Sequence, residues 1–338
     1  ATDDDYRAAG ADILSSADAL FEQADMIIKV KEPQPEECQK LREGQILFTY
    51  LHLAPDPEQA AALIGSNAIA IAYETVTDPN GRLPLLTPMS EIAGRMSTQV
   101  GAHYLQKPLG GSGKLLSGAA GVLRAHVLII GGGVAGFNAA RMAVGLGGRV
   151  TVMDKNPDRM RELDQFFAGR LDVIDSNREN LERILPHADL IIGAVLIPGG
   201  AAPKLIGRDD LKRIRQGSVL VDIAIDQGGC FETSRPTTHD QPVYQVEGIN
   251  HYAVANMPGA VPHTSAHALN QAVLPYIEAI AAKGWQQAMA DDPHLLNGLN
   301  ICQGAVTHRE VAEGLGLHYT DPNNFINGNF INRNFIKK

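Results

Sequence analysis

The stretch AHVLIIGGGVAG (residues 125–136) decides the fold. Its apolar run Val127–Ile130 predicts a buried strand, and the residues after the glycines have the pattern of a helix. Between them lies Gly-x-Gly-x-x-Gly, formed by Gly131, Gly133 and Gly136. A strand before such a loop and a helix after it are the context in which the loop binds the pyrophosphate of a dinucleotide. The stretch therefore predicts a Rossmann-type nucleotide site.

Each glycine has a separate task in such a loop. Gly131 permits the tight turn, Gly133 lets the backbone approach the pyrophosphate, and Gly136 lets the helix pack closely on the strand. The predicted helix begins with Val134 and Ala135. The N-terminus of a helix carries a partial positive charge and has N–H groups that no carbonyl of the helix accepts. These five residues are our first candidates for cofactor binding.

An acidic residue follows the next predicted strand. Asp154 comes directly after Val150–Met153, where a carboxylate can accept hydrogen bonds from both ribose hydroxyls of the adenosine half. A 2′-phosphate at this position would meet a like charge, which typically costs several kcal/mol. The sequence therefore favours NAD over NADP as the cofactor.

Strands and helices alternate along most of the chain. Helical stretches separate short apolar runs, which predict buried parallel strands, at Met26–Ile28, Ile46–Phe48, Ile69–Ala72, Leu190–Leu196, Ser218–Ile225 and Tyr252–Ala255. From Pro262 the pattern is helical through Ile280, and shorter helical pieces follow to Gly316. We expect an α/β protein with two Rossmann-like domains, each with a parallel sheet.

The predicted domains are discontinuous. Residues 1–84 and 263–321 are expected to form a substrate domain, residues 85–262 the NAD-binding domain, and the active cleft lies between the two. Residues 322–338 repeat Asn-Phe-Ile, a compositional bias that predicts a disordered tail.

Composition excludes several classes of protein. The net charge of −9 offers no basic face for nucleic acid. The sequence has no apolar run of about 18 residues for a membrane helix, and residues 1–6 lack the regions of a signal peptide. Three widely spaced cysteines form neither a disulfide framework nor a metal motif, so we expect a cytoplasmic protein. His263 and His267 could share a helix face, but with no third ligand evident we predict no metal site.

Stretches outside the Rossmann unit are more specific. They are KVKEP (29–33), LFTYLHLA (47–54), LLTPMSE (85–91), DIAIDQGG (222–229) and VANMPGAVP (254–262). Together they closely resemble bacterial L-alanine dehydrogenases, in order, over residues 1 to about 321. The same superfamily includes the NAD-binding component of proton-translocating transhydrogenase, but the stretch containing His52 fits the dehydrogenases better.

The resemblance implies a reaction and a set of residues. The family is an oxidoreductase of alanine catabolism that converts L-alanine, NAD and water into pyruvate, ammonium and NADH. Lys31 falls on the substrate-binding lysine, His52 on the catalytic histidine, and Asp226 on the aspartate that assists catalysis. Glu74 has a similar position without a definite role. Beyond the glycine loop, the positions that line the cofactor are Ser90, Asp154, Arg159, Ser176, Val195, Leu196 and Asn256.

These residue types suit the chemistry. A histidine can take and return protons near neutral pH, a lysine ammonium can stabilise charge that develops on oxygen, and a carboxylate can bind an amine or hold a water molecule. Each also has an ordinary structural interpretation. His52 in an apolar strand is typical of a core histidine, Lys31 of an edge charge, and Asp154 of a turn residue.

The family pattern differs from this sequence at its start. Family chains begin some forty residues earlier, with an Asn-Arg-Val-Ala-like motif whose arginine binds the substrate carboxylate, and nothing here matches that motif. The resemblance therefore predicts impaired turnover for the chain as given. The family forms homohexamers, which implies an oligomer here. Two other functions stay open: a non-catalytic NAD(H)-binding module like the transhydrogenase component, and an amino-acid oxidoreductase with another substrate.

Overall fold

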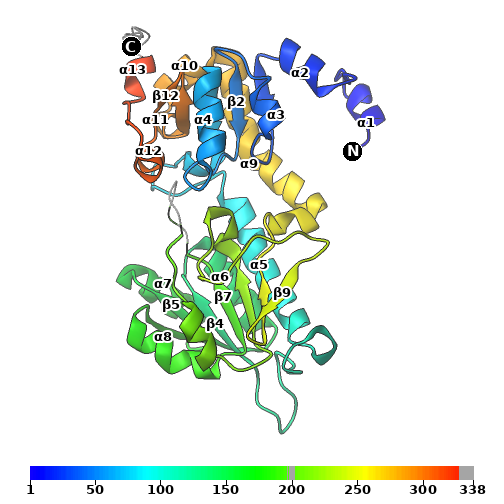
Figure 1. Cartoon of the computed structure of the whole chain (residues 1–338), viewed down its shortest axis with the longest axis vertical. Coiled ribbons are helices and arrows are strands. Elements are labelled where there is room, and N and C mark those ends of the chain that lie inside the picture. The colour runs from blue at the N-terminus through cyan, green and yellow to red at the C-terminus, as the bar shows by residue number, and fades with distance from the viewer. Residues whose placement is uncertain (196, 198–201, 327–338) are drawn as a thin grey trace. The chain divides into compact units, whose positions relative to one another are not determined.

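A computed structural model of the chain describes residues 1–195, 197 and 202–326. The chain divides into two compact units (Figure 1). The central unit is Pro84–Pro275, and the terminal unit consists of Ala1–Leu83 and the chain from Tyr276 onward. Each unit has its own sheet and its own hydrophobic core.

The central unit is built on a seven-stranded sheet. Its strands in chain order are β4 (His126–Ile130), β5 (Arg149–Asp154), β6 (Asp172–Asp175), β7 (Leu190–Gly193), β8 (Val219–Asp222), β9 (Val243–Val246) and β10 (Ile249–Tyr252). In space their order is β6-β5-β4-β7-β8-β10-β9. All pairs are parallel except the antiparallel pair of β9 and β10 at one edge. The order reverses between β4 and β7, which is where doubly wound sheets bind their ligands.

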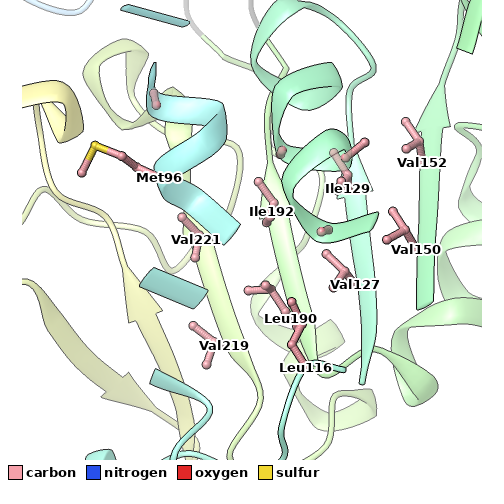
Figure 2. Packing of buried hydrophobic residues seen from close by; sticks show 14 of the residues in the cluster. Met96, Leu116, Val127, Ile129, Val150, Val152, Leu190, Ile192, Val219 and Val221 are labelled. Carbon is pink, nitrogen blue, oxygen red and sulfur yellow. The ribbon is translucent and has the colours of Figure 1, made fainter. Parts of the chain in front are cut away.

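Alternate residues of the central strands enter two different cores. Val127 and Ile129 of β4 belong to one buried cluster, and Leu128 and Ile130 belong to another. Figure 2 shows the first cluster, in which Val127 and Ile129 lie beside the valines of β5 and the apolar residues of β7. Both faces of the sheet are therefore covered, which explains why these strands are apolar at nearly every position.

Helices cover both faces of this sheet. The first core contains residues of α5, α6 and α7, and the second contains residues of α8, η3 and η4. The helical elements of the central unit are α5 (Thr87–Tyr104), η2 (Lys107–Leu109), α6 (Val134–Gly145), α7 (Pro157–Phe167), α8 (Arg178–Ile184), η3 (Leu185–His187), η4 (Arg208–Arg213), η5 (Ile223–Gln227), η6 (Met257–Ala260) and the first part of α9 (Pro262–Lys283).

The terminal unit has a five-stranded sheet made from both ends of the chain. Its strands are β1 (Met26–Ile28), β2 (Ile46–Thr49), β3 (Ile69–Ala72), β11 (Leu299–Cys302) and β12 (Ala305–Val306), in that spatial order. The first three are parallel, whereas β11 is antiparallel to β3 and β12 is antiparallel to β11. The helical elements are α1 (Asp3–Ala8), α2 (Ala17–Gln23), α3 (Pro35–Cys38), α4 (Pro57–Ser66), η1 (Tyr73–Thr75), α10 (Trp285–Asp291), α11 (Pro293–Leu296), α12 (Arg309–Leu315) and α13 (Asn323–Ile326).

Three sequence-based expectations need correction. The segment around residues 299–306 forms strands β11 and β12 rather than helical pieces, because these residues complete the sheet beside β3. The unit boundary lies at Pro275 rather than near residue 263, since Ala268 of α9 packs against the central core. Disorder does not begin at residue 322: Phe325 of α13 is buried, and its carbonyl accepts a hydrogen bond from Gln286 Nε2. Residues 327–338 of the predicted tail lie outside the described residues.

Most other strand expectations agree with the structure, but the predicted strand Tyr252–Ala255 shares only Tyr252 with β10, and the predicted strand Leu190–Leu196 extends beyond β7, which ends at Gly193. β3 has the predicted bounds Ile69–Ala72, β4 begins one residue before its predicted run, and β5 is one residue longer than its predicted run at each end. The predicted strand Ser218–Ile225 is shorter, because β8 ends at Asp222 and the chain continues as η5. Within the described ranges, no helix combines the length and apolarity needed to cross a membrane.

Candidate active site

The glycine loop joins β4 to α6 and leaves the helix N-terminus exposed. Gly131 has φ +100°, in the left-handed region that favours glycine, and a Cβ there would lie 2.7 Å from the carbonyl oxygen of Ala194. At Gly136 a Cβ would lie 1.7 Å from the carbonyl oxygen of Gly131. At Gly133, in contrast, no atom of the described chain lies within 4 Å of a Cβ position. Gly133 and Val134 are exposed, so the loop presents open backbone.

Asp154 and Arg159 hold this loop from two sides. Gly132 N–H donates to Asp154 Oδ2 over 2.7 Å, and Arg159 Nε donates to the Gly132 carbonyl over 2.7 Å. Asp154 Oδ1 also accepts from the N–H of Asn156, at the start of α7. Both side chains are therefore next to the loop before any ligand is considered. Asp154 and Arg159 were predicted from the sequence as cofactor residues, whereas Gly132 was not, because x positions of the glycine pattern carry no residue preference.

The remaining cofactor candidates in the central unit follow the carboxyl ends of strands. Val195 comes after β7, and its Cγ2 would lie 3.0 Å from a Cβ at Gly131. Ser176 follows β6, and its N–H donates to the Asp154 carbonyl over 2.9 Å. Ser90 lies in the first turns of α5, half-buried. Leu196 lies outside the described residues. Val195 is thus adjacent to Gly131 at the reversal of strand order between β4 and β7, and Ser176 is adjacent to Asp154 at the end of β6.

Asp226 and Asn256 form a second group in the central unit. Asn256 N–H donates to Asp226 Oδ2 over 3.3 Å, and Asn256 has a left-handed φ of +62°. The loop that carries Asp226 is held by Asp222, a buried carboxylate that accepts hydrogen bonds from the backbone of Cys230 and from the Ser234 hydroxyl. The structure brings together two predicted residues that are thirty positions apart in sequence.

Lys31 and His52 lie together in the terminal unit, joined through Glu32. His52 Nδ1 is 2.5 Å from Glu32 Oε1, and Lys31 Nζ is 3.3 Å from Glu32 Oε2. Lys31 and Glu32 follow β1, and His52 follows β2, so parallel pairing of these two strands places the three side chains at one edge of the sheet. The side chains of His52 and Glu32 retain 13% and 21% of their exposed surface, so water screens the pair only partly.

Glu32 is ionised across the physiological range. Burial opposes its charge, but the hydrogen bond from His52 and the positive charges of His52 and Lys31 outweigh that effect and lower the pKa of Glu32 to about 2. An ionised carboxylate at this distance accepts a proton-bearing Nδ1, so the ring is held in a defined orientation.

The backbone of His52 is held by a second carboxylate. His52 is one of the non-glycine residues with positive φ, at +45°. Glu74, at the start of η1 after β3, is 3% exposed, and its Oε1 accepts hydrogen bonds from the N–H groups of His52 over 2.7 Å and Leu51 over 3.1 Å. Tyr50 stacks on the His52 ring with centroids 5.8 Å apart. Glu74 has no definite role in the sequence-based prediction, and in the structure it makes this backbone contact.

Histidine and acidic residues elsewhere do not assemble into a metal centre in the described ranges, where no group of three or more His, Cys, Asp or Glu is placed to hold an ion. The rings of His263 and His267 are 4.9 Å apart on α9. The candidate chemistry therefore lies with two sets of residues: the glycine loop with Asp154, Arg159, Asp226 and Asn256 in the central unit, and Lys31, Glu32, His52 and Glu74 in the terminal unit.

Comparison with known proteins covers both units. Residues 1–93 match the family model "Alanine dehydrogenase/PNT, N-terminal domain", and residues 97–309 match "Alanine dehydrogenase/PNT, C-terminal domain". The chain belongs to the alanine dehydrogenase/PNT family. The family assignment agrees with the resemblance noted from the sequence, and the fold agrees with the expected pair of Rossmann-like domains.

Relatives within the alanine dehydrogenase/PNT family are similar over nearly all of the chain. The alanine dehydrogenase of Halomonas elongata is 56% identical over 320 residues, which cover 95% of this chain and 86% of that protein. The alanine dehydrogenase of Methanococcus maripaludis is 52% identical over 327 residues, covering 96% and 88%. That of Mycobacterium tuberculosis is 50% identical over 321 residues, covering 95% and 86%.

Solved structures give the same result. A structure described as L-alanine dehydrogenase has a TM-score of 0.84 at 47% identity, and covers 93% of this chain and 87% of that one. A transhydrogenase from Sinorhizobium meliloti has a TM-score of 0.72 at 23% identity, with 91% and 86% covered. The second likeness concerns the fold alone.

Proposed function

We propose that this chain is an NAD-dependent L-alanine dehydrogenase. It would convert L-alanine, NAD⁺ and water reversibly into pyruvate, ammonium, NADH and a proton. The observation that carries the proposal is the similarity to alanine dehydrogenases, which are 50–56% identical over about 95% of this chain. In this chain Lys31 and His52 lie near each other at one edge of the terminal sheet, both in contact with Glu32.

The glycine loop fits a dinucleotide. Gly133 presents exposed backbone with open space where a Cβ would stand, directly before the twelve-residue helix α6. The N-terminus of a helix of this length favours the binding of an anionic phosphate. We propose that the cofactor is held by Ser90, Gly131, Gly133, Val134, Ala135, Gly136, Asp154, Arg159, Ser176, Val195, Leu196 and Asn256. Bound there, NAD would supply the redox chemistry of the reaction, as the acceptor of the hydride from the alanine Cα.

Asp154 is the proposed determinant of NAD over NADP. Its carboxylate lies beside Gly132 at the end of β5, where the adenosine ribose of a dinucleotide is held in this fold. A 2′-phosphate placed there would meet the negative charge. Arg159, whose Nε is committed to the Gly132 carbonyl, offers less compensation to that phosphate than an uncommitted guanidinium would.

His52 is the proposed acid–base residue. Deamination requires that water add to the oxidised carbon and that ammonia leave, and both events move protons near neutral pH. An imidazole is suited to this because its ordinary pKa is near 6.5. His52 is only partly exposed and is held by contacts at both its ring and its backbone, so its position is defined before substrate binds.

Lys31 and Asp226 complete the proposed set. The Lys31 ammonium would bind the carboxylate or the carbonyl oxygen of the substrate and stabilise negative charge that develops there. The Asp226 carboxylate would bind the substrate amine or hold the attacking water molecule. We propose that Lys31, His52 and Asp226 act in the same reaction.

The proposal is tested by mixing the purified chain with L-alanine and NAD and following NADH absorbance, and by running pyruvate, ammonium and NADH in reverse. D-Alanine and NADP are the matched controls. We expect turnover with the L-isomer and NAD in both directions, at the impaired rate that the resemblance predicts for this chain. NADH binding without turnover in either direction would support a binding module, and faster turnover with another amino acid would replace alanine as the substrate.

We further infer a homo-oligomer, hexameric as in the family, in the cytoplasm. All three cysteines are buried and unpaired with one another, which suits a reducing compartment. Sedimentation velocity of the purified chain, with a sixfold protomer mass expected by the family resemblance, tests the first inference, and cell fractionation tests the second.

A further inference from the structure

Glu32 stands apart from the residues considered so far because it contacts two of the proposed reaction residues at once. One carboxylate oxygen, Oε1, lies 2.5 Å from His52 Nδ1, and the other, Oε2, lies 3.3 Å from Lys31 Nζ. Its neighbour Lys29 pairs instead with Glu37 of α3. Glu32 and Glu37 thus have separate lysine partners, and Glu32 is the one of these two that contacts the His52 ring.

The two nitrogens of an imidazole are chemically different once one of them is engaged. A carboxylate accepts hydrogen bonds but cannot donate them, so an ionised Glu32 keeps a proton on Nδ1 in both the neutral and the charged ring. The proton that the ring gains and loses is then the one on Nε2. Without the carboxylate, the neutral ring would divide between two tautomers, and only one of them is basic at Nε2.

We propose that Glu32 is a positioning residue for His52, which it holds with Nδ1 protonated so that Nε2 exchanges protons with the substrate. This inference rests on the proposed function. It adds to that function a residue that touches neither substrate nor cofactor but determines which atom of His52 takes part in the reaction.

The charges around His52 determine the direction of the effect on pH dependence. Glu32 and Lys31 face the ring from the segment after β1, Glu74 faces the backbone from η1, and Tyr50 stacks on the ring from the end of β2. His308, before α12, is close enough for the charge of Glu74 to act on it. When the Glu32 charge is removed, the positive Lys31 stays near the ring. The charged imidazole is then less favourable, and the limb of the pH profile that reports it moves to lower pH.

The test compares Glu32→Gln with Glu37→Gln. Glu37 is a matched control, because its side chain is 24% exposed against 21% for Glu32, it also pairs with a lysine, and it does not contact His52. We expect Glu32→Gln to lower kcat for alanine oxidation by about ten- to a hundredfold, and to shift the acidic limb of the kcat/KM profile down by about one pH unit. Glu32→Asp should recover part of the rate. Glu37→Gln should change neither quantity.

A second measurement does not depend on alanine turnover. With ¹⁵N-labelled histidine, the ring nitrogens of His52 are assigned by comparison with His52→Ala. The parent protein should show Nδ1 protonated on both sides of the titration, and Glu32→Gln should show a mixture of tautomers. If the parent ring is a mixture, or if Glu32→Gln leaves the tautomer, the rate and the pH limb unchanged, the proposal is wrong. If the parent does not oxidise alanine but the ring behaves as expected, the proposed function fails and the Glu32–His52 relationship stands.

Discussion

The backbone N–H of His52 donates a hydrogen bond to the buried carboxylate of Glu74, 2.7 Å away, and His52 has a left-handed φ of +45°. A residue with a Cβ rarely adopts this conformation, and it persists only where its surroundings hold it. The same Glu74 oxygen accepts the N–H of Leu51. The backbone of the proposed catalytic residue His52 is thus in an unfavourable conformation, and the Glu74 carboxylate holds it there.

Two replacements of Glu74 should distinguish the effect of its hydrogen bonds to the backbone from the effect of its negative charge. Glu74→Ala leaves the buried N–H of Leu51 and the partly buried N–H of His52 without their acceptor, which should lower the free energy of unfolding by about 2–4 kcal/mol and reduce kcat. Glu74→Gln keeps an acceptor oxygen and should stay much closer to the parent. Urea unfolding and alanine kinetics on both variants check this, with Glu22→Ala, an exposed carboxylate of α2, as the control. Equal behaviour of the Ala and Gln variants would show that the hydrogen bonds do not hold His52.

Replacement of His52 should affect the reaction and not cofactor binding. His52→Ala removes the proposed acid–base group, so kcat should fall by about 10²- to 10⁴-fold. NADH affinity should stay within about twofold, because the residues proposed to bind the phosphates and the ribose belong to the central unit. Turnover, NADH titration and melting temperature are measured together, with the exposed His103→Ala as the control. A sharp fall in melting temperature with turnover per folded molecule within about threefold would make His52 a structural residue.

Asp154 should control the choice of cofactor. The parent should bind NAD(H) at least about tenfold more tightly than NADP(H), because the carboxylate repels a 2′-phosphate. Asp154→Ala should narrow this ratio, and it should also weaken NADH binding, because Gly132 loses the acceptor of its N–H. Calorimetric titrations with both cofactors test this, and Asp158→Ala, an exposed carboxylate of α7, is the control. Equal affinities of the parent for the two cofactors would contradict the assignment.

The contact between α5 and α6 should depend on Gly94. A Cβ at Gly94 would lie 2.1 Å from the carbonyl oxygen of Ala135, in the first turn of α6. Gly94→Ala should therefore lower stability by more than about 1 kcal/mol and weaken NADH binding, since the helix N-terminus must move. Gly145, at the other end of α6, has no described atom within 4 Å of its Cβ position. Gly145→Ala should be neutral or stabilising by up to about 1 kcal/mol. Thermal unfolding and NADH titration of the two variants provide the comparison.

Buried histidines should make the folded state less stable in mild acid. Burial lowers the pKa of His251 below its ordinary value of 6.5, and the neutral ring accepts from Thr233 at Nε2 while Nδ1 donates to the Ile249 carbonyl. As pH falls through about 6.5, the unfolded chain therefore binds a proton that the folded chain does not, and stability decreases. Urea midpoints between about pH 5 and 7 should rise with pH in the parent. The slope should be smaller in His251→Gln and unchanged in the exposed His103→Gln.

The central fold could be predicted because its signals are local. The strand before Gly131, the helix that begins at Val134 and the acidic residue at the end of β5 are each visible within a few residues of sequence, and all three are present in the structure. Lys31 and His52 were found through family resemblance, since neither residue type marks an active site by itself.

Other features depend on contacts between distant segments. β11 has the mixed sequence Leu-Asn-Ile-Cys, and its identity as a strand comes from antiparallel pairing with β3. The left-handed conformation of His52 has no local signal, because glycine and asparagine are the residues that usually indicate it. Glu74 can be interpreted only once its carboxylate is seen beside that backbone.

The terminal sheet has a consequence for biosynthesis. Ile71 of β3 pairs with Leu299 of β11, so the two edges that meet in this sheet leave the ribosome more than two hundred residues apart. The central unit is continuous in sequence, so it can fold once residue 275 has left the ribosome. The wholly apolar strand β3, in contrast, has no partner at its β11 edge until Leu299 has been synthesised. An open edge of this kind is a site of aggregation. Nascent chains that stall before Leu299 should therefore depend on chaperones, although their nucleotide-binding unit is complete.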